Sequence, residues 1–179
     1  MLLKSGVTSP GLGIVARDDR LDWYYSSEIP VKALGGIMCR IVVVDYDEDE
    51  AKEEFHVAIR NFLSIDQAAL NEAEPFIFRY YEDVNSDWEP GDDEYVRIDS
   101  PSEIWRHIQL GNQPIVSRRA YRDKQIYVSL ECKCGWEPEH GLQMVFKNGL
   151  RVTKLGRYDG HLSNADAYAN DELEDVVYR

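Results

Sequence analysis

The sequence predicts a single α+β domain over residues 1–179, in which an antiparallel sheet carries two or three helices packed on one face. Extended segments rich in β-branched and aromatic residues occupy the first and last parts of the chain, whereas the middle shows the apolar period of a helix. A hydrophobic content of 44% over 179 residues is ordinary for one globular domain. We therefore expect N-terminal strands and a C-terminal β-meander to build the sheet.

The first part of the chain, up to about Tyr46, carries the signals of strands separated by turns. β-branched and aromatic clusters occupy residues 13–16, 23–25, 29–31 and 37–44. The last of these segments is almost continuously apolar. It is therefore expected to form a strand that is covered on both faces.

A helical pattern follows Tyr46. Asp47 is expected to cap the helix, with Glu48, Asp49 and Glu50 in the first turn, where the helix dipole favours anions. The apolar stripe of this helix consists of Ala51, Phe55, Ile59 and Phe62.

A second helix is predicted to begin with a capping box formed by Ser64 and Gln67. Pro75 lies inside the pattern, so we expect a kink or a restart there. Residues 82–94 carry seven acidic residues and no basic one, together with Pro90 and Gly91. This composition is typical of a solvated loop.

The last part of the chain opens with a third helix signal, since Ser100 precedes Pro101 and Glu103 completes a capping box; Gly111 would end this helix. A meander of strands is expected over residues 115–116, 126–134, 142–147 and 150–155. The acidic C-terminal tail, residues 164–179, is expected to be irregular.

The dipeptide Asn148-Gly149 predicts a two-residue hairpin turn, and this turn sets the register of its strands. Lys147 would then face Leu150, and His140 would face Arg157. The loop before the hairpin would meet the segment after it at one end of the sheet. The residues expected to gather at this rim are Glu137, Glu139, His140, Asp159 and His161.

This rim permits two interpretations. In one, His140, His161 and Asp159 bind zinc, iron or manganese, and Glu137 or Glu139 acts as the base of a metal-assisted hydrolase. In the other, the same residues only make hydrogen bonds at a turn. The sequence contains no H-E-x-x-H motif and no pair of C-x-x-C knuckles, so the spacing does not decide between them.

The positions of the cysteines and the absence of known catalytic motifs argue against several kinds of active site. Cys132 and Cys134 share the face of a strand that also carries Ile126, Val128 and Leu130, so both thiols are expected in the core, as is Cys39. No nucleophile elbow and no phosphate-binding glycine loop is present. Three cysteines do not make a disulfide framework, which favours a reducing compartment.

The charge balance excludes several partners. With 20 basic and 33 acidic residues, the net charge is −13, which argues against nucleic acids and anionic membranes. The basic cluster of Arg118, Arg119, Arg122 and Lys124 is expected to balance local acids. The sequence has neither a membrane-spanning apolar stretch nor a secretory signal at its start, so we expect a cytoplasmic protein.

The acidic runs at residues 45–54 and 82–94 are interpreted either as solvated faces or as a docking surface for a basic protein. Trp88 and Trp136 are the candidate aromatic anchors of such a surface. Trp136 has a second interpretation, as an internal anchor of its loop. The oligomeric state is left open.

Three stretches of the chain resemble an uncharacterised bacterial domain family of unknown function. They are residues 24–31, the helical residues 54–63, and above all the signature E-C-K-C-G-W-E-P-E-H-G-L-Q at 131–143 with Y-D-G-H-L at 158–162. The resemblance implies an architecture without a catalytic assignment. By analogy of size and charge with bacterial immunity proteins, the first hypothesis is a non-catalytic partner of a basic toxin or effector, and the metal-assisted hydrolase is the alternative.

Overall fold

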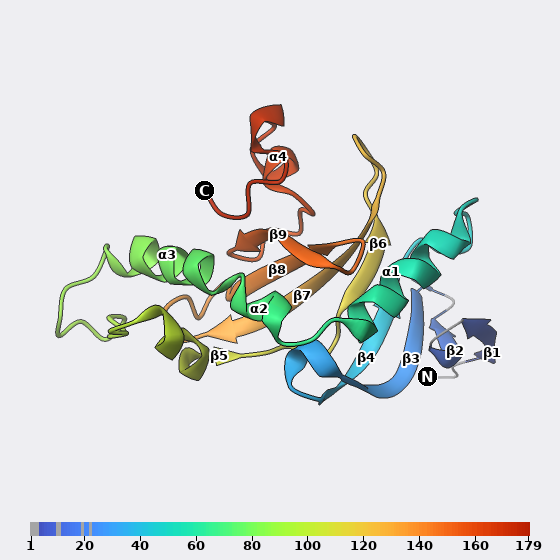
Figure 1. Cartoon of the computed structure of the whole chain (residues 1–179), viewed down its shortest axis with the longest axis horizontal. Coiled ribbons are helices and arrows are strands. Elements are labelled where there is room, and N and C mark those ends of the chain that lie inside the picture. Colours follow the sequence, from blue (N-terminus) through green and yellow to red (C-terminus); the bar gives the residue numbers. More distant parts are fainter. Residues whose placement is uncertain (1–3, 10–11, 19, 22) are drawn as a thin grey trace.

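The computed structural model describes residues 4–9, 12–18, 20–21 and 23–179, and its fold is the predicted α+β class. Residues 1–3, which begin the segment examined for a secretory signal, lie outside the described residues. One open, mostly antiparallel sheet has the strand order β1-β2-β3-β4-β6-β7-β8-β9, and a short β5 pairs with β7 (Figure 1). The strands are β1 (Lys4–Ser9), β2 (Gly13–Asp18), β3 (Trp23–Val31), β4 (Ile37–Val43), β5 (Ile108–Gln109), β6 (Ile115–Arg118), β7 (Ile126–Cys134), β8 (Leu142–Lys147) and β9 (Arg151–Gly156).

The N-terminal strands and the C-terminal meander meet at β4 and β6, which pair in parallel through Val42 with Ile115 and Val43 with Val116. A parallel pair needs a long crossover connection. Here that connection contains all the helices of the middle part of the chain, so the sheet is completed across a helical layer.

The helices α1 (Lys52–Ser64), α2 (Ala68–Asn71) and α3 (Glu74–Asn85) lie in a row across one face of the sheet (Figure 1). Phe55, Ile59 and Phe62 of α1 are buried, and the Phe62 ring lies 5.3 Å from that of Phe146 on β8. This confirms the predicted helical layer. Short 3-10 helices also occur at Lys32–Leu34, Pro101–His107 and Asp171–Leu173, and α4 spans Asn164–Ala167.

Helix α1 begins four residues later than predicted, at Lys52 instead of Glu48, because the acidic residues expected to start it are used elsewhere. Asp47 accepts a hydrogen bond from the Tyr24 hydroxyl at 2.6 Å and pairs with Arg17. Asp49 accepts from the Ala51 backbone N–H and holds Arg118. Tertiary partners therefore displace Asp47 from its predicted capping role, and Ala51 is exposed.

Of the next two predicted helix starts, the one at Ser64 is wrong and the one at Pro75 is confirmed. Ser64 is the last residue of α1 and donates to the Asn61 carbonyl, so it forms no capping box with Gln67. The expected restart at Pro75 is confirmed, since Pro75 lies in the first turn of α3. Helix α3 extends to Asn85, so the acidic loop begins only after it.

The helix predicted after Ser100 is a 3-10 helix, Pro101–His107, without a side-chain cap from Ser100. It ends before Gly111 because residues 108–109 form β5. Gly111 instead packs against β7, where a Cβ atom would lie 1.9 Å from the Glu131 carbonyl oxygen.

The register of the β8–β9 hairpin also differs from the prediction. Lys147 pairs with Arg151, not with Leu150, so the turn has three residues, and a bulge follows at Val145 and Phe146. The turn rests on α1: Asn61 donates to the Asn148 carbonyl, and a Cβ atom on Gly149 would lie 2.1 Å from the Ala58 carbonyl oxygen. Contact with the helix therefore shapes this turn.

The acidic tail contains α4 and the 3-10 helix at Asp171–Leu173, and it covers the second face of the sheet. Because side chains alternate along β7, Val128 faces the helices whereas Tyr127 and Ser129 face the tail. Arg119, only 2% exposed, donates hydrogen bonds to Asp166 at 2.6 Å, Glu174 at 2.7 Å and Ser163 at 2.8 Å. The tail is thus fastened by one buried guanidinium.

The other two arginines of the basic cluster are also used internally. Arg118 bonds to Asp49 and Glu54, and Arg122 bonds to Asp166 and Asp171. This confirms that these arginines balance local acids. Among the described residues, no helix is long and apolar enough to cross a membrane.

Replacing Arg119 with Met is expected to lower the free energy of unfolding by about 3 kcal/mol, because Asp166 and Glu174 lose a buried cation. Urea denaturation at neutral pH measures this loss. The control is Arg122→Met, whose side chain is 30% exposed and whose loss should be about 1 kcal/mol or less. Equal losses in the two variants would contradict the role given to Arg119.

Candidate functional site

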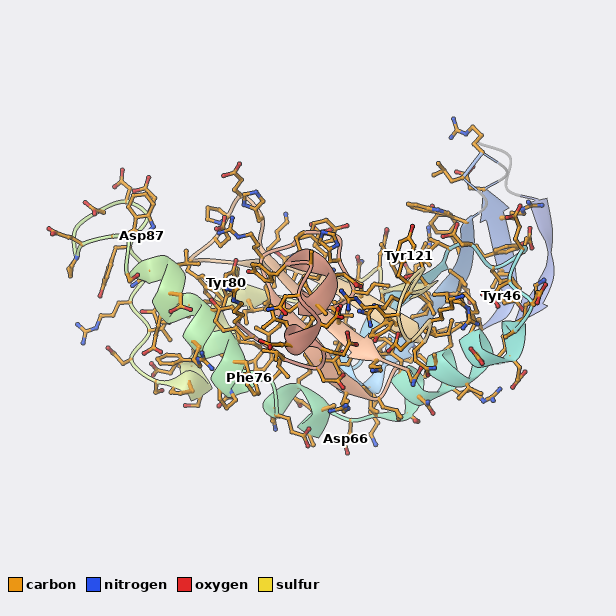
Figure 2. All side chains as sticks on the ribbon, turned by 90° about the horizontal axis from the view of Figure 1, so that it is seen from above. Tyr46, Asp66, Phe76, Tyr80, Asp87 and Tyr121 are labelled. Atoms are coloured by element: carbon orange, nitrogen blue, oxygen red, sulfur yellow. The ribbon has the colours of Figure 1, made fainter. Side chains whose placement is uncertain are left out.

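A cleft of about 530 Å³ lies between α3 with its acidic loop, the loop that joins β7 to β8, the end of β9 and the C-terminal segment. Figure 2 shows Tyr80 on α3 and Asp87 on the loop after it, at the end of the molecule opposite Tyr46. The cleft is lined by both aromatic rings and carboxylates. The aromatic residues are Tyr80, Trp88, Trp136, Tyr168 and Tyr178, and the acidic ones are Asp83, Asp87, Glu94, Glu137, Glu139 and Asp159.

Buried rings hold the walls of the cleft together. Trp136 is 2% exposed and packs edge-on against Tyr80 and Tyr81, with ring centroids 6.0 and 5.8 Å away. Tyr80 donates to the Gly141 carbonyl, and the Tyr178 ring lies 5.8 Å from Tyr80. Trp136 therefore anchors its loop, whereas Trp88 is 39% exposed and offers a contact surface.

A buried lysine, which the sequence analysis did not single out, also lines the cleft. The Lys154 ammonium donates to Gln143 at 2.9 Å and to Asp159 at 2.8 Å, and its side chain is 2% exposed. Burial lowers the pKa of Lys154 below its ordinary value, although the hydrogen bond with Asp159 acts in the opposite direction. Gln143 in turn donates to Ser129.

The segment after β9, with Asp159 and His161, is held in place by its hydrogen bonds to Lys154 and Gln143. Asp159 is its ion-pair partner and also accepts a hydrogen bond from the His161 backbone N–H at 2.8 Å. The His161 carbonyl lies 3.3 Å from the Gln143 amide nitrogen, which donates to it. Asp159 and His161 thus close a hydrogen-bonded chain over the sheet.

The predicted proximity of the two rim segments is confirmed, because the Tyr158 backbone N–H donates to the His140 carbonyl at 3.3 Å. The ligand set differs from the predicted one. Among the described residues, the group whose ligand atoms lie within 4.8 Å of one another consists of Glu137, Glu139 and His140. Neither Asp159 nor His161 belongs to it.

Within this group, one Glu137 carboxylate oxygen accepts from the His140 backbone N–H at 3.2 Å and lies 3.4 Å from the ring nitrogen Nδ1. The His140 side chain is 41% exposed. Gly141, next in the chain, has a φ of 63°, and a Cβ atom there would lie 2.3 Å from the Cys132 carbonyl oxygen. The chain can therefore turn here only with glycine.

The cysteines are buried, as predicted, and all three are free thiols. Burial raises the pKa of both Cys132 and Cys134 to about 12. Both are therefore protonated near neutral pH, which disfavours nucleophilic or metal-binding roles.

Comparison with known proteins identifies a family that covers most of the fold and part of the cleft. A family model described as a domain of unknown function (DUF6985) matches residues 11–162. These residues include the whole helical layer, the rim and Lys154, whereas the tail that completes the cleft lies outside the match. No curated protein and no solved structure matches the chain.

Removing Asp159 is expected to destabilise the protein more than removing Lys154, because the lysine is buried and the aspartate is 30% exposed. Asp159→Ala leaves an uncompensated buried ammonium and should lower the free energy of unfolding by about 3 kcal/mol. Lys154→Met leaves a carboxylate that water can reach, so about 1 kcal/mol is expected. Urea denaturation of both variants measures the order, and the reverse order would refute this assignment.

Proposed function

The chain belongs to the family described as a domain of unknown function (DUF6985). From the charge and the aromatic lining of its cleft, we propose that it is a non-catalytic module that binds a basic protein there. Its role would be that of a cytoplasmic bacterial immunity protein, which neutralises a basic toxin or effector by occupying it. The partner would place cationic side chains between α3 and the rim.

The main support for this proposal is that some acidic side chains form ion pairs within the protein, whereas others, at the cleft, do not. Asp166 and Glu174 are neutralised by Arg119 inside the protein. In the part of the chain that the structure describes, Asp87, Glu94 and Glu139 form no ion pair, although all three line the cleft. Six acidic residues line the cleft against three basic ones, Lys154, Arg157 and Arg179. Negative charge is therefore in excess at the cleft, where it would accelerate the approach of a cation and select against anions.

Of the two predicted aromatic anchors, only Trp88 suits a partner. Trp88 is 39% exposed at the cleft, next to Asp87, whereas Trp136 is only 2% exposed although it also lines the cleft. Interface energy commonly concentrates in a few residues such as Trp, surrounded by charges that steer association. Trp88 with the unpaired carboxylates has this composition.

The test captures partners from an extract of the native host on the immobilised protein and measures the association kinetics of each stoichiometric partner. The variant carries Asp87→Lys, Glu94→Lys and Glu139→Lys. A basic partner should associate at least about tenfold more slowly with this variant, and the rate should depend less on salt.

The matched control reverses three exposed acids that do not line the cleft, through Glu28→Lys, Glu48→Lys and Glu72→Lys. Both variants change the net charge equally, so only the position of the charge differs. Equal association rates of the two variants, or a partner that is acidic, would contradict the proposal.

The group of Glu137, Glu139 and His140 favours a second candidate, a metal-assisted hydrolase. Two carboxylates and an imidazole within 4.8 Å of one another suit zinc, iron or manganese and leave positions open for water. Because Glu137 and Glu139 would now be ligands, neither is free to act as the base assigned to it from the sequence.

If this candidate is correct, protein purified without chelators should contain about one equivalent of metal by elemental analysis. His140→Ala should lose that metal, and its melting temperature should no longer rise on addition of zinc, iron or manganese salts. His161→Ala is the control and should keep the metal. Metal-free wild-type protein whose melting temperature is unchanged by these ions would exclude this candidate.

A further inference from the structure

From the way the chain fills its own cleft, we propose that the cleft recognises an arginine side chain of its partner, in the place that Arg179 holds in the free protein. This inference rests on the proposed binding function and specifies the chemistry of the partner. It also makes the C-terminal end of the described chain an internal competitor of that partner.

The first observation is a guanidinium that lies over an aromatic ring at the cleft, with both side chains exposed to solvent. The guanidinium carbon of Arg179 lies 4.5 Å from the centroid of the Tyr168 ring, and both residues line the cleft. This is the shortest of the cation–ring distances found in the described residues. The cleft thus accommodates a planar cation against an aromatic wall.

The second observation concerns how the last residues reach this place. The Leu155 backbone N–H on β9 donates to the Val177 carbonyl at 2.7 Å, so residue 177 lies along the edge of the sheet. The Tyr178 hydroxyl donates to Asp83 at 2.8 Å, and its ring packs on Tyr80. These contacts deliver Arg179 to the cleft, and they involve neither Arg119 nor its carboxylates.

The third observation is that Arg179 does not pair with the carboxylates of the cleft. Within the described residues it forms no ion pair, and Asp87, Glu94 and Glu139 of the same cleft form none either. Arg179 therefore occupies the aromatic wall without neutralising the carboxylates. An arginine on a partner chain that approaches from the solvent could combine both, with its face on Tyr168 and its N–H groups on a carboxylate.

This arrangement favours arginine over lysine. A guanidinium is planar, stacks on rings and presents five N–H donors in a fork that matches a carboxylate, whereas an ammonium is a compact and strongly hydrated charge. The long-range attraction of the net negative charge is the same for both cations. The ring of Tyr168 supplies the difference.

Because Arg179 is tethered, its effective concentration at the cleft is high, and a partner must displace it. Removing this side chain should therefore strengthen binding of an arginine peptide, although it removes a contact from the folded protein. A purely structural role for Arg179 predicts no gain in affinity.

The experiment titrates two peptides of equal charge into the full chain by calorimetry at low ionic strength: acetyl-Gly-Arg-Gly-Arg-Gly-amide and its lysine counterpart. Arg179→Ala should bind the arginine peptide about three- to fivefold more tightly than the wild type does. On Arg179→Ala, the arginine peptide should bind at least about threefold more tightly than the lysine peptide.

The aromatic wall is tested by Tyr168→Leu in the Arg179→Ala background, which should abolish the preference for arginine while leaving charge-driven binding of both peptides. Tyr168 is 53% exposed, so this variant is expected to fold. The control is Tyr121→Leu, which removes a ring that is 78% exposed and does not line the cleft, and which should leave the preference unchanged.

Three results would overturn the inference: no binding of the arginine peptide, equal binding of the two peptides to Arg179→Ala, or no gain in affinity on removing Arg179. Its failure is distinguishable from failure of the proposed function. A captured basic protein that depends on Asp87, Glu94 and Glu139 but shows no arginine preference would refute the inference alone. Arginine-selective peptide binding without any basic protein partner would refute the function alone.

Discussion

The structure depends on one buried guanidinium, that of Arg119, which connects the sheet to a tail more than 40 residues further along the chain. Burial alone would lower the pKa of Arg119, but its hydrogen bonds with Glu174 and Asp166 outweigh this effect and raise that pKa above its ordinary value. Without these bonds the part of the tail that carries Asp166 and Glu174 would lose its attachment to the second face of the sheet. The wall of the cleft around Tyr168 would then be held less firmly, whereas Tyr178 would keep its own contacts with Asp83 and Tyr80.

The two faces of the sheet are stabilised by different physics, and the cleft lies where they meet. Helices α1 to α3 cover one face with apolar contacts such as Phe62 on Phe146. Hydrogen bonds and charge stabilise the other face, through the strand residues Ser129, Gln143 and Lys154 and through the bonds of the tail to Arg119. At the β9 edge, α3 and the tail approach each other through Tyr80 and Tyr178. The cleft between α3 and the tail is therefore lined by both aromatic rings and carboxylates.

The sequence correctly predicted those features that depend on neighbouring residues in the chain. Alternation along β7 correctly placed Cys132 and Cys134 in the core, and chain reversal at Asn148 correctly made the two rim segments neighbours. The start of α1 and the hairpin register were wrong, because Tyr24 and Arg17 hold Asp47, and α1 shapes the turn. The burial of Lys154 could not be predicted at all. It results from Asp159 and the tail, so nothing within its own strand distinguishes it from a solvent-facing lysine.

The short parallel ladder between β4 and β6 is a seam between two meanders, each of which satisfies most of its own backbone groups. Beside the ladder itself, the N–H groups of Arg40, Val42 and Val44 donate across it to the carbonyls of Asn112, Pro114 and Val116. Helix α1 connects the two meanders, because it packs on β6 and β7 on one side of the seam and on the 3-10 helix that precedes β4 on the other. Either meander could therefore diverge in sequence or length while the other kept its pairing, provided that the apolar side of α1 continued to fit both.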